Sequence, residues 1–328
     1  MKKLSVLVST LLFSSYSFAH HGVASLGAAG LEGPGAPLET SSSATLPEGS
    51  WLGYMKLDYA NFKKYDEQIF GTDQKDTAQF WLYGIGYGLK PYLSLYAFLP
   101  YNVKTKTDGS YNTSGFADIS FMAVLGFKYD EGFKLVPKNE SLDDMKDWHF
   151  TIYGGFSIPT GDENKRPAGK PIEPDMSTGF GKPSYSIGFT ATKQFSDNWT
   201  FVFDTNYIKF LEHTYNDGTR YEFGDETRFN TALVYRTITI PEKKFRLDTT
   251  IEANYLYLAR DKENGEKLSA SGGKILYNLL GFRAYYKNTS LGAGVKIPVW
   301  KSLNEEDQQQ GCEGKEKYRF IFTFSVLF

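Results

Sequence analysis

The chain has 328 residues, of which 41% are hydrophobic and 23% charged, and its 36 basic residues nearly balance its 38 acidic ones. This charge content argues against a disordered chain, and the absence of a basic excess argues against nucleic-acid binding. After the N-terminal region, no run of about 18 apolar residues supplies a spanning helix. A membrane barrel remains possible, because only every second residue of its strands meets lipid.

The N-terminus has the pattern of an export signal. Lys2 and Lys3 form a basic end, residues 4–13 are mostly apolar, and Ser17-Phe18-Ala19 offers a small-x-small cleavage site. We therefore expect residues 1–19 to be a signal peptide and the mature protein to reside in a bacterial envelope. Cys312 is the sole cysteine, so no intramolecular disulfide can form.

Residues 20–49 differ in composition from the rest of the chain. They are rich in Gly, Ala, Ser and Pro, nearly free of aromatic residues, and carry spaced apolar residues such as Leu38 and Leu46. Such a composition predicts an irregular segment, and we consider both a plug inside a barrel and a flexible periplasmic tail. The predicted organisation is a signal peptide (1–19), an irregular plug or periplasmic segment (20–49) and a β-barrel (50–328).

From Trp51 onward, aromatic and β-branched residues alternate with polar ones. This period of two predicts about twelve strands. Each is long for a soluble protein and suits a tilted crossing of a bilayer. Their expected spans are 51–64, 78–90, 92–105, 116–129, 148–159, 183–195, 199–212, 226–239, 245–259, 274–287, 289–300 and 317–328.

The connections between these strands alternate between long and short, which is typical of outer-membrane barrels. The connection 130–147 is the exception, being long where a short turn is expected. The sequence thus predicts an all-β protein, an antiparallel transmembrane barrel of about twelve strands in the bacterial outer membrane. A secreted β-sandwich is the alternative, but it does not require alternating connection lengths.

The predicted inward faces carry charges of both signs, as barrel interiors do. These charges either filter a solute or pair with one another to fill a narrow barrel. The expected lumen-lining residues are Lys56, Asp58, Asp118, Asp204, Arg228, Arg236, Arg246, Asp248, Glu252, Arg283, Lys296 and Arg319.

Glycines recur at two-residue spacing on one face of two expected strands. Gly84, Gly86 and Gly88 form one row, and Gly292 and Gly294 form another. Glycine in a strand allows another part of the chain to approach closely. We consider two explanations: residues 20–49 pack against these rows inside the lumen, or the glycines relieve strain in curved strands.

The sequence offers little for catalysis. It contains neither GxSxG nor HExxH, and its four histidines leave most acid–base designs without their usual participant. We expect no enzyme activity and no cofactor. His20 and His21, beside the free amine of the mature chain, could hold copper or nickel, and a solvated terminus is the alternative. His149 and His213 are expected near the membrane interfaces.

The last predicted strand resembles the terminal signal that the bacterial barrel assembly machinery reads. Its apolar face consists of Phe320, Phe322, Phe324, Val326 and Phe328. The resemblance implies that assembly machinery as a partner. Outer-membrane lipid, lipopolysaccharide and a small-molecule solute are the other expected partners, with no nucleic acid.

Three short motifs resemble a known family. Gly30 to Thr40 reads GLEGPGAPLET, Leu99 to Tyr101 reads LPY, and Ile158 to Gly161 reads IPTG. They are similar to outer-membrane proteins of the MetA pathway of phenol degradation. The resemblance implies a channel-like barrel, distantly similar to long-chain fatty-acid transporters, whose barrels carry an N-terminal hatch.

Two functions are therefore expected. The first is passive passage of a small hydrophobic or aromatic solute through an outer-membrane channel. The second is a non-transporting envelope protein that binds metal or a periplasmic efflux partner through residues 20–49.

Overall fold

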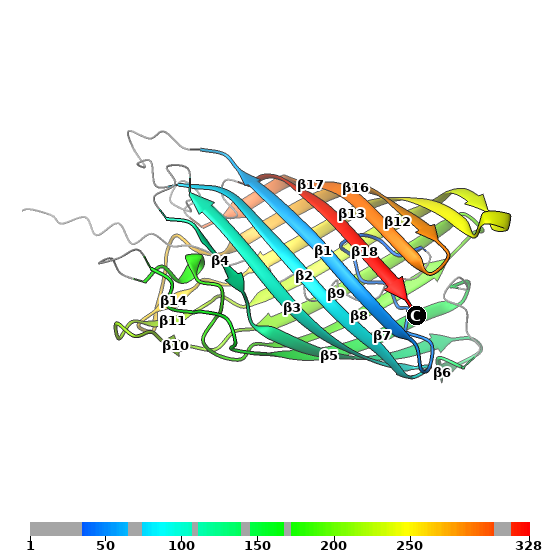
Figure 1. Ribbon diagram of the computed structural model, residues 1–328, viewed down its shortest axis with the longest axis horizontal. Helices are drawn as coiled ribbons and strands as arrows, with labels where there is room; N and C mark the ends of the chain where they lie inside the picture. Colours follow the sequence, from blue (N-terminus) through cyan, green and yellow to red (C-terminus); the bar gives the residue numbers. More distant parts are fainter. Residues whose placement is uncertain (1–34, 65–73, 107–110, 139–144, 167–171, 305–315) are drawn as a thin grey trace, which may run out of the picture.

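The computed structural model describes residues 35–64, 74–106, 111–138, 145–166, 172–304 and 316–328. Twelve long antiparallel strands form one closed barrel, which confirms the predicted fold class (Figure 1). In order around the wall they are β1 (Trp51–Phe62), β2 (Lys75–Lys90), β3 (Leu93–Lys106), β5 (Ile119–Tyr129), β7 (Trp148–Ile158), β8 (Tyr185–Gln194), β9 (Trp199–Lys209), β12 (Glu226–Ile240), β13 (Phe245–Leu258), β16 (Gly273–Tyr286), β17 (Thr289–Leu303) and β18 (Glu316–Leu327).

The first and last strands close the barrel. β1 pairs with β18 along most of its length, from Leu52 opposite Leu327 to Phe62 opposite Glu316. At the end of the seam, the amide of Trp51 donates to the carbonyl of Phe328 at 2.7 Å, and the amide of Phe328 donates back at 2.8 Å. The closed ladder satisfies the backbone groups that an open edge would expose to lipid.

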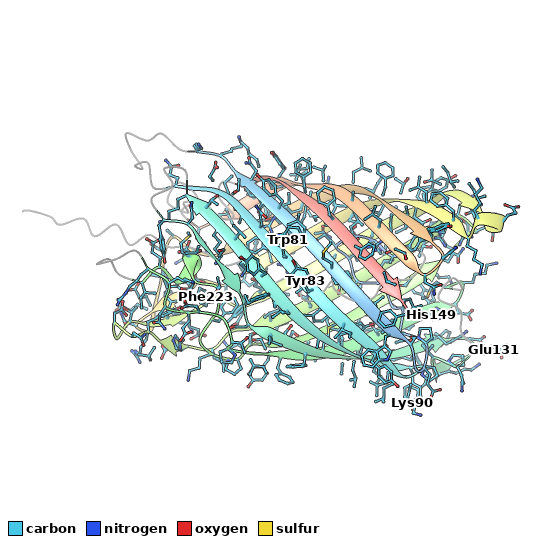
Figure 2. The ribbon with its side chains drawn as sticks, viewed as in Figure 1. Trp81, Tyr83, Lys90, Glu131, His149 and Phe223 are labelled. Atoms are coloured by element: carbon cyan, nitrogen blue, oxygen red, sulfur yellow. The ribbon has the colours of Figure 1, made fainter. Side chains whose placement is uncertain are left out.

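The two ends of the barrel differ. One end carries short turns, β6 and the C-terminus, and Lys90, Glu131 and His149 lie there (Figures 1 and 2). The other end carries long connections, and Phe223 lies among them (Figure 2). Short turns are periplasmic and long loops extracellular in barrels of this class. Alternate side chains along β1 are buried, as the period of two predicted.

Further short strands lie outside the twelve. β4 (Thr113–Phe116) pairs with β3, and the bend at 117–118 separates it from β5, so the expected strand 116–129 is split. Four short strands of the extracellular loops form a second sheet, in the order β10 (His213–Thr214), β11 (Arg220–Glu222), β14 (Lys262–Glu263) and β15 (Glu266–Lys267). Two 3-10 turns, η2 (Pro174–Met176) and η3 (Pro241–Lys243), complete the described elements.

The long periplasmic connection 130–147 has a structural role. Its strand β6 (Phe133–Leu135) folds back onto the end of β5. Val136 and Met145 from the same connection are buried, and they line a pocket together with residues 43–47. The unexpected length thus supplies side chains that cover the periplasmic side of the N-terminal segment.

Candidate functional site: the luminal constriction

Residues 35–46 lie within the barrel, and each of them is buried. Gly35 donates its amide to Asp248 of β13 at 3.0 Å, Ser43 donates to Thr192 of β8 at 2.9 Å, and Leu46 donates to Ser94 of β3 at 2.8 Å. These three strands belong to different parts of the wall. Residues 35–46, which we call the luminal segment, therefore cross the interior from β13 to β3.

The centre of the luminal segment is held by a buried carboxylate. Glu252 of β13 accepts hydrogen bonds from the amides of Leu38 at 2.7 Å and Thr40 at 2.8 Å, and from Glu39 at 3.2 Å. It also accepts one from the Thr40 hydroxyl at 2.8 Å. Successive amides aimed at one anion form a concave anion site. Glu252 thereby satisfies backbone groups that lack a strand partner.

The side chain of Glu39 turns toward β1 and β17. It pairs with Lys56 of β1, and with Lys296 of β17 at 2.9 Å. All three side chains are at most 5% exposed. The Lys296 ammonium also lies 4.6 Å from the centre of the Tyr277 ring, within range of a cation–π contact. Glu39 therefore ties the luminal segment to β1 and β17 through buried ion pairs.

Glycines make room for the luminal segment. A Cβ at Gly281, Gly292 or Gly294 would lie 2.3, 2.5 or 2.6 Å from the Leu38 side chain. On β2, a Cβ at Gly86 would lie 2.9 Å from the Leu46 side chain. Since real Cβ atoms do not approach this closely, a larger residue at any of these positions would force the Leu38 or Leu46 side chain to move.

An aromatic cluster packs against the end of the luminal segment. Tyr96 and Phe98 stack with ring centroids 5.9 Å apart, and Leu46 and Tyr153 belong to the same buried cluster. Tyr153 donates its hydroxyl to Asp204 at 2.8 Å. These inward rings are packed against protein in this closed arrangement.

On the extracellular side of Glu39 lies a small pocket. Its wall combines three cations with two carboxylates and several amide or aromatic groups: Arg228, Lys296 and Arg319; Glu39 and Asp58; Asn230, Asn254, Tyr255, Leu256 and Tyr277. Arg319 bonds to Asp58 at 3.2 Å and to Glu316 at 2.7 Å. The pocket is thus polar and close to charge-balanced.

Toward the extracellular end, inward side chains become apolar. Ala60, Phe62, Ala78 and Phe80 form one buried cluster on β1 and β2. Leu256, Leu258, Ile275 and Tyr277 form another on β13 and β16. Barrel interiors are ordinarily polar, so buried apolar clusters in the extracellular half are a specific feature of this lumen.

The extracellular loops add a third apolar cluster. Phe180, Phe210 and Phe223 pack together, with centroids 4.9 to 6.2 Å apart. Asp118, in the bend before β5, accepts hydrogen bonds from the amides of Gly161 and Phe180 at 2.9 Å and so fastens the loop after β7. Lys104 donates to the carbonyl of Ser177 at 2.6 Å. The loops are therefore bound to inward groups of the rim.

Asp261 is a buried acid beside this extracellular cluster. It accepts hydrogen bonds from the Tyr221 hydroxyl at 2.7 Å and the Gly224 amide at 2.7 Å. Burial raises the pKa of Asp261 to about 7, although these hydrogen bonds oppose the rise. Burial likewise lowers the pKa of His213, whose ring packs edge-on against Tyr215.

The residues expected to line the lumen occupy three places. Those that touch the luminal segment or its supports are Lys56, Arg246, Asp248, Glu252, Arg283 and Lys296. Asp58, Arg228 and Arg319 line the pocket, and Asp204 accepts a hydrogen bond from Asn230 of the pocket wall. Asp118 lies at the extracellular rim and Arg236 near the periplasmic end of β12. All are buried or half-buried. Their role in solute passage stays a prediction.

Several contributors to the site were not foreseen from the sequence. Glu39 was not among the candidates, although it is the acidic residue of the PLET stretch, Pro37 to Thr40. His149 was expected at the membrane interface, but its side chain is buried and lines the pocket under residues 43–47. In the alternation of β7, His149 falls on the inward face, between the partly exposed residues Trp148 and Phe150. This alternation is the signal that could have placed His149 inward.

The apolar face of β18 points outward. Phe320, Phe322 and Phe324 are exposed on the barrel surface, while Thr323 and Ser325 are buried. The assembly signal predicted on this face, with Val326 and Phe328, stays a prediction.

His20 and His21, the signal peptide and residues 20–34 lie outside the described residues. Among the described residues, no group of three or more His, Cys, Asp or Glu is arranged to hold a metal. Within the same part of the chain, no helix is long and apolar enough to cross a membrane.

The tilted, closed twelve-strand wall with an apolar exterior defines a β-barrel of the bacterial outer membrane. Residues 64–299 match the model of the family described as "Putative MetA-pathway of phenol degradation", and the chain belongs to that family. No curated protein sequence matches this chain.

Three solved structures are similar to this chain, and the first of them shares its fold. The COG4313 outer membrane channel from Pseudomonas putida F1 is 12% identical, with a TM-score of 0.65 over 87% of this chain and 98% of that chain. The NanC porin is 9% identical, with a TM-score of 0.44 over 84% and 98%. The CymD monoaromatic hydrocarbon channel is 9% identical, with a TM-score of 0.40 over 86% and 88%.

Proposed function

We propose that this protein is an outer-membrane channel for passive passage of a small aromatic solute that carries a polar group. The observation that carries the proposal is the order of surfaces inside the barrel. Buried apolar clusters on β1, β2, β13 and β16 lead to a charged pocket, and the luminal segment closes that pocket. A molecule with an apolar body and a polar group matches both surfaces.

The family description and the structural relatives support a channel rather than an enzyme. The family is described by phenol degradation, and one structural relative is itself an outer membrane channel. We infer that the luminal segment is the gate, because it fills the lumen and is anchored through side-chain hydrogen bonds rather than through a strand ladder. Such an anchor can be released without opening the wall.

The alternative function requires residues 20–49 to bind metal or a periplasmic partner. In this state residues 35–46 are buried within the barrel, so they offer no surface to a partner protein. That alternative therefore depends on residues 20–34 and on the exposed residues 47–49.

A reversible crosslink tests the gate. The Ser43 and Thr190 hydroxyls lie 2.7 Å apart, so Ser43→Cys with Thr190→Cys, in a Cys312→Ser background, allows a disulfide between the luminal segment and β8. In planar bilayers, we expect the oxidised protein to show no solute-sized conductance and dithiothreitol to restore it. The single Ser43→Cys variant is the control for the reductant. Equal conductance in both redox states would rule out the luminal segment as the gate.

A further inference from the structure

Lys56 and Lys296 belong to strands of the barrel wall, whereas the Glu39 carboxylate that they bind belongs to the luminal segment. β1 and β17 both pair with β18, where Lys56 lies opposite Thr323 and Lys296 lies opposite Arg319. Their positions are therefore fixed by continuous hydrogen-bonded ladders. The carboxylate between them comes from Glu39, which lies on an irregular segment.

Without a carboxylate this site would be strongly unfavourable. Both lysine side chains are at most 5% exposed, and burial of an unpaired ammonium group is costly. Arg228 and Arg319, which line the same pocket as Lys296, add further positive charge nearby. Asp58 is already bonded to Arg319. Release of Glu39 would therefore leave two buried cations that another anion could stabilise.

The site borders a small polar pocket on its extracellular side. Glu39 and Lys296 both contribute to the wall of that pocket, and so does the ring of Tyr277. A carboxylate that replaces Glu39 would thus meet the Lys296 ammonium beside an aromatic face. A planar carboxylate with an aromatic body matches this combination.

We propose that Lys56 and Lys296 form a carboxylate-binding site, that Glu39 occupies it in the closed state, and that a small aromatic carboxylate replaces Glu39 there. Replacement frees the side chain that ties the luminal segment to β1 and β17. The binding site is independent of transport, whereas the release of the luminal segment by the solute rests on the proposed function.

Chemical rescue tests the binding site. In detergent-solubilised protein, we expect Glu39→Ala to lower the melting temperature and sodium benzoate or acetate to restore it. The apparent affinity should be at least tenfold higher than in the triple variant Glu39→Ala, Lys56→Met, Lys296→Met. Sodium chloride at the same ionic strength should not restore it. Glu48→Ala is the matched control, because Glu48 forms an exposed pair with Lys90 at 3.1 Å.

Equal rescue by chloride, or equal rescue in the triple variant, would overturn the binding site. If Glu39→Ala does not fold, Glu39→Gln retains the shape of the side chain and allows the same titration.

In bilayers, benzoate should raise the open probability of the unmodified protein severalfold more than benzyl alcohol, and Glu39→Gln should be open without either. If rescue succeeds while the disulfide-locked channel still conducts, the binding site stands and the gate of the proposed function fails.

Discussion

Gly88 and Pro47 approach so closely that a Cβ at position 88 would lie 2.0 Å from the Pro47 carbonyl oxygen. The contact is between backbone groups, so no flexible side chain can move aside. The Gly49 amide also donates to the Gly88 carbonyl at 2.8 Å. Together these contacts fix the position at which the luminal segment turns into β1.

Gly88→Ala should therefore displace the end of the luminal segment. We expect a loss of about 1–3 kcal/mol in the free energy of unfolding, which is the usual cost of overpacking. Limited proteolysis within residues 35–49 should also become faster. Gly53→Ala is the matched control on β1, because its Cβ would lie 3.8 Å from the nearest atom. Equal protease resistance of both variants would contradict the close packing at Gly88.

Glu252→Gln should loosen the centre of the luminal segment. The carboxylate accepts from three amides and one hydroxyl, whereas an amide side chain places an NH₂ group against some of these donors. Leaving a buried donor without an acceptor costs about 1–3 kcal/mol. We expect faster hydrogen exchange at the amides of Leu38 and Thr40 and a higher open probability in bilayers. Glu266→Gln, in the exposed β15, should change neither measurement.

The barrel could be predicted from the sequence because its signal is local. A period of two is visible within each strand, and β7 and β9 begin at the predicted residues 148 and 199. The position of Glu39 has no such signal. Its partner Lys296 lies 257 residues away, and no pattern in the sequence links the two. The length of connection 130–147 could not be predicted either, because its role also depends on a long-range contact. Val136 and Met145 of this connection pack beneath residues 43–47.

The extracellular cluster should lose stability as pH rises from about 4 to about 7. Below pH 4, Asp261 is protonated in both the folded and the unfolded loops. Between an unfolded pKa of about 3.9 and the folded pKa of about 7, only the unfolded form releases the proton, so folding becomes less favourable with rising pH. Three pKa units correspond to at most about 4 kcal/mol. Asp175 and Glu226, whose charges also raise the pKa of Asp261, belong to the same environment.

Hydrogen exchange of the Gly224 amide, which donates to Asp261, measures this pH dependence. After correction for the intrinsic exchange rate, protection should fall across that pH range in the unmodified protein. In Asp261→Asn the slope should largely disappear, because Asn keeps an acceptor without titrating. An unchanged slope in the variant would assign the effect to another group.

Arg319→Met should be strongly destabilising. It removes the cation that pairs with Asp58 and Glu316 and leaves two buried carboxylates without it. Breaking a buried pair in this way costs about 3–5 kcal/mol. Arg220→Met is the control, because Arg220 is 52% exposed and lies 3.7 Å from Glu212. Its loss should cost less than about 1 kcal/mol. Urea unfolding in detergent micelles compares the two variants, and similar midpoints would contradict a stabilising Arg319 network.

The contacts of the luminal segment also impose an order on biogenesis. Leu38 and Thr40 bind Glu252 across separations of 214 and 212 residues, although the segment itself precedes β1. Its docking surfaces on β13, β16 and β17 do not exist until the late strands have been laid down, and closing so long a loop carries an entropic cost. Docking of residues 35–46 must therefore follow the formation of β13, β16 and β17. If the segment is the gate proposed above, a barrel that closes before this step would admit solutes until the segment docks.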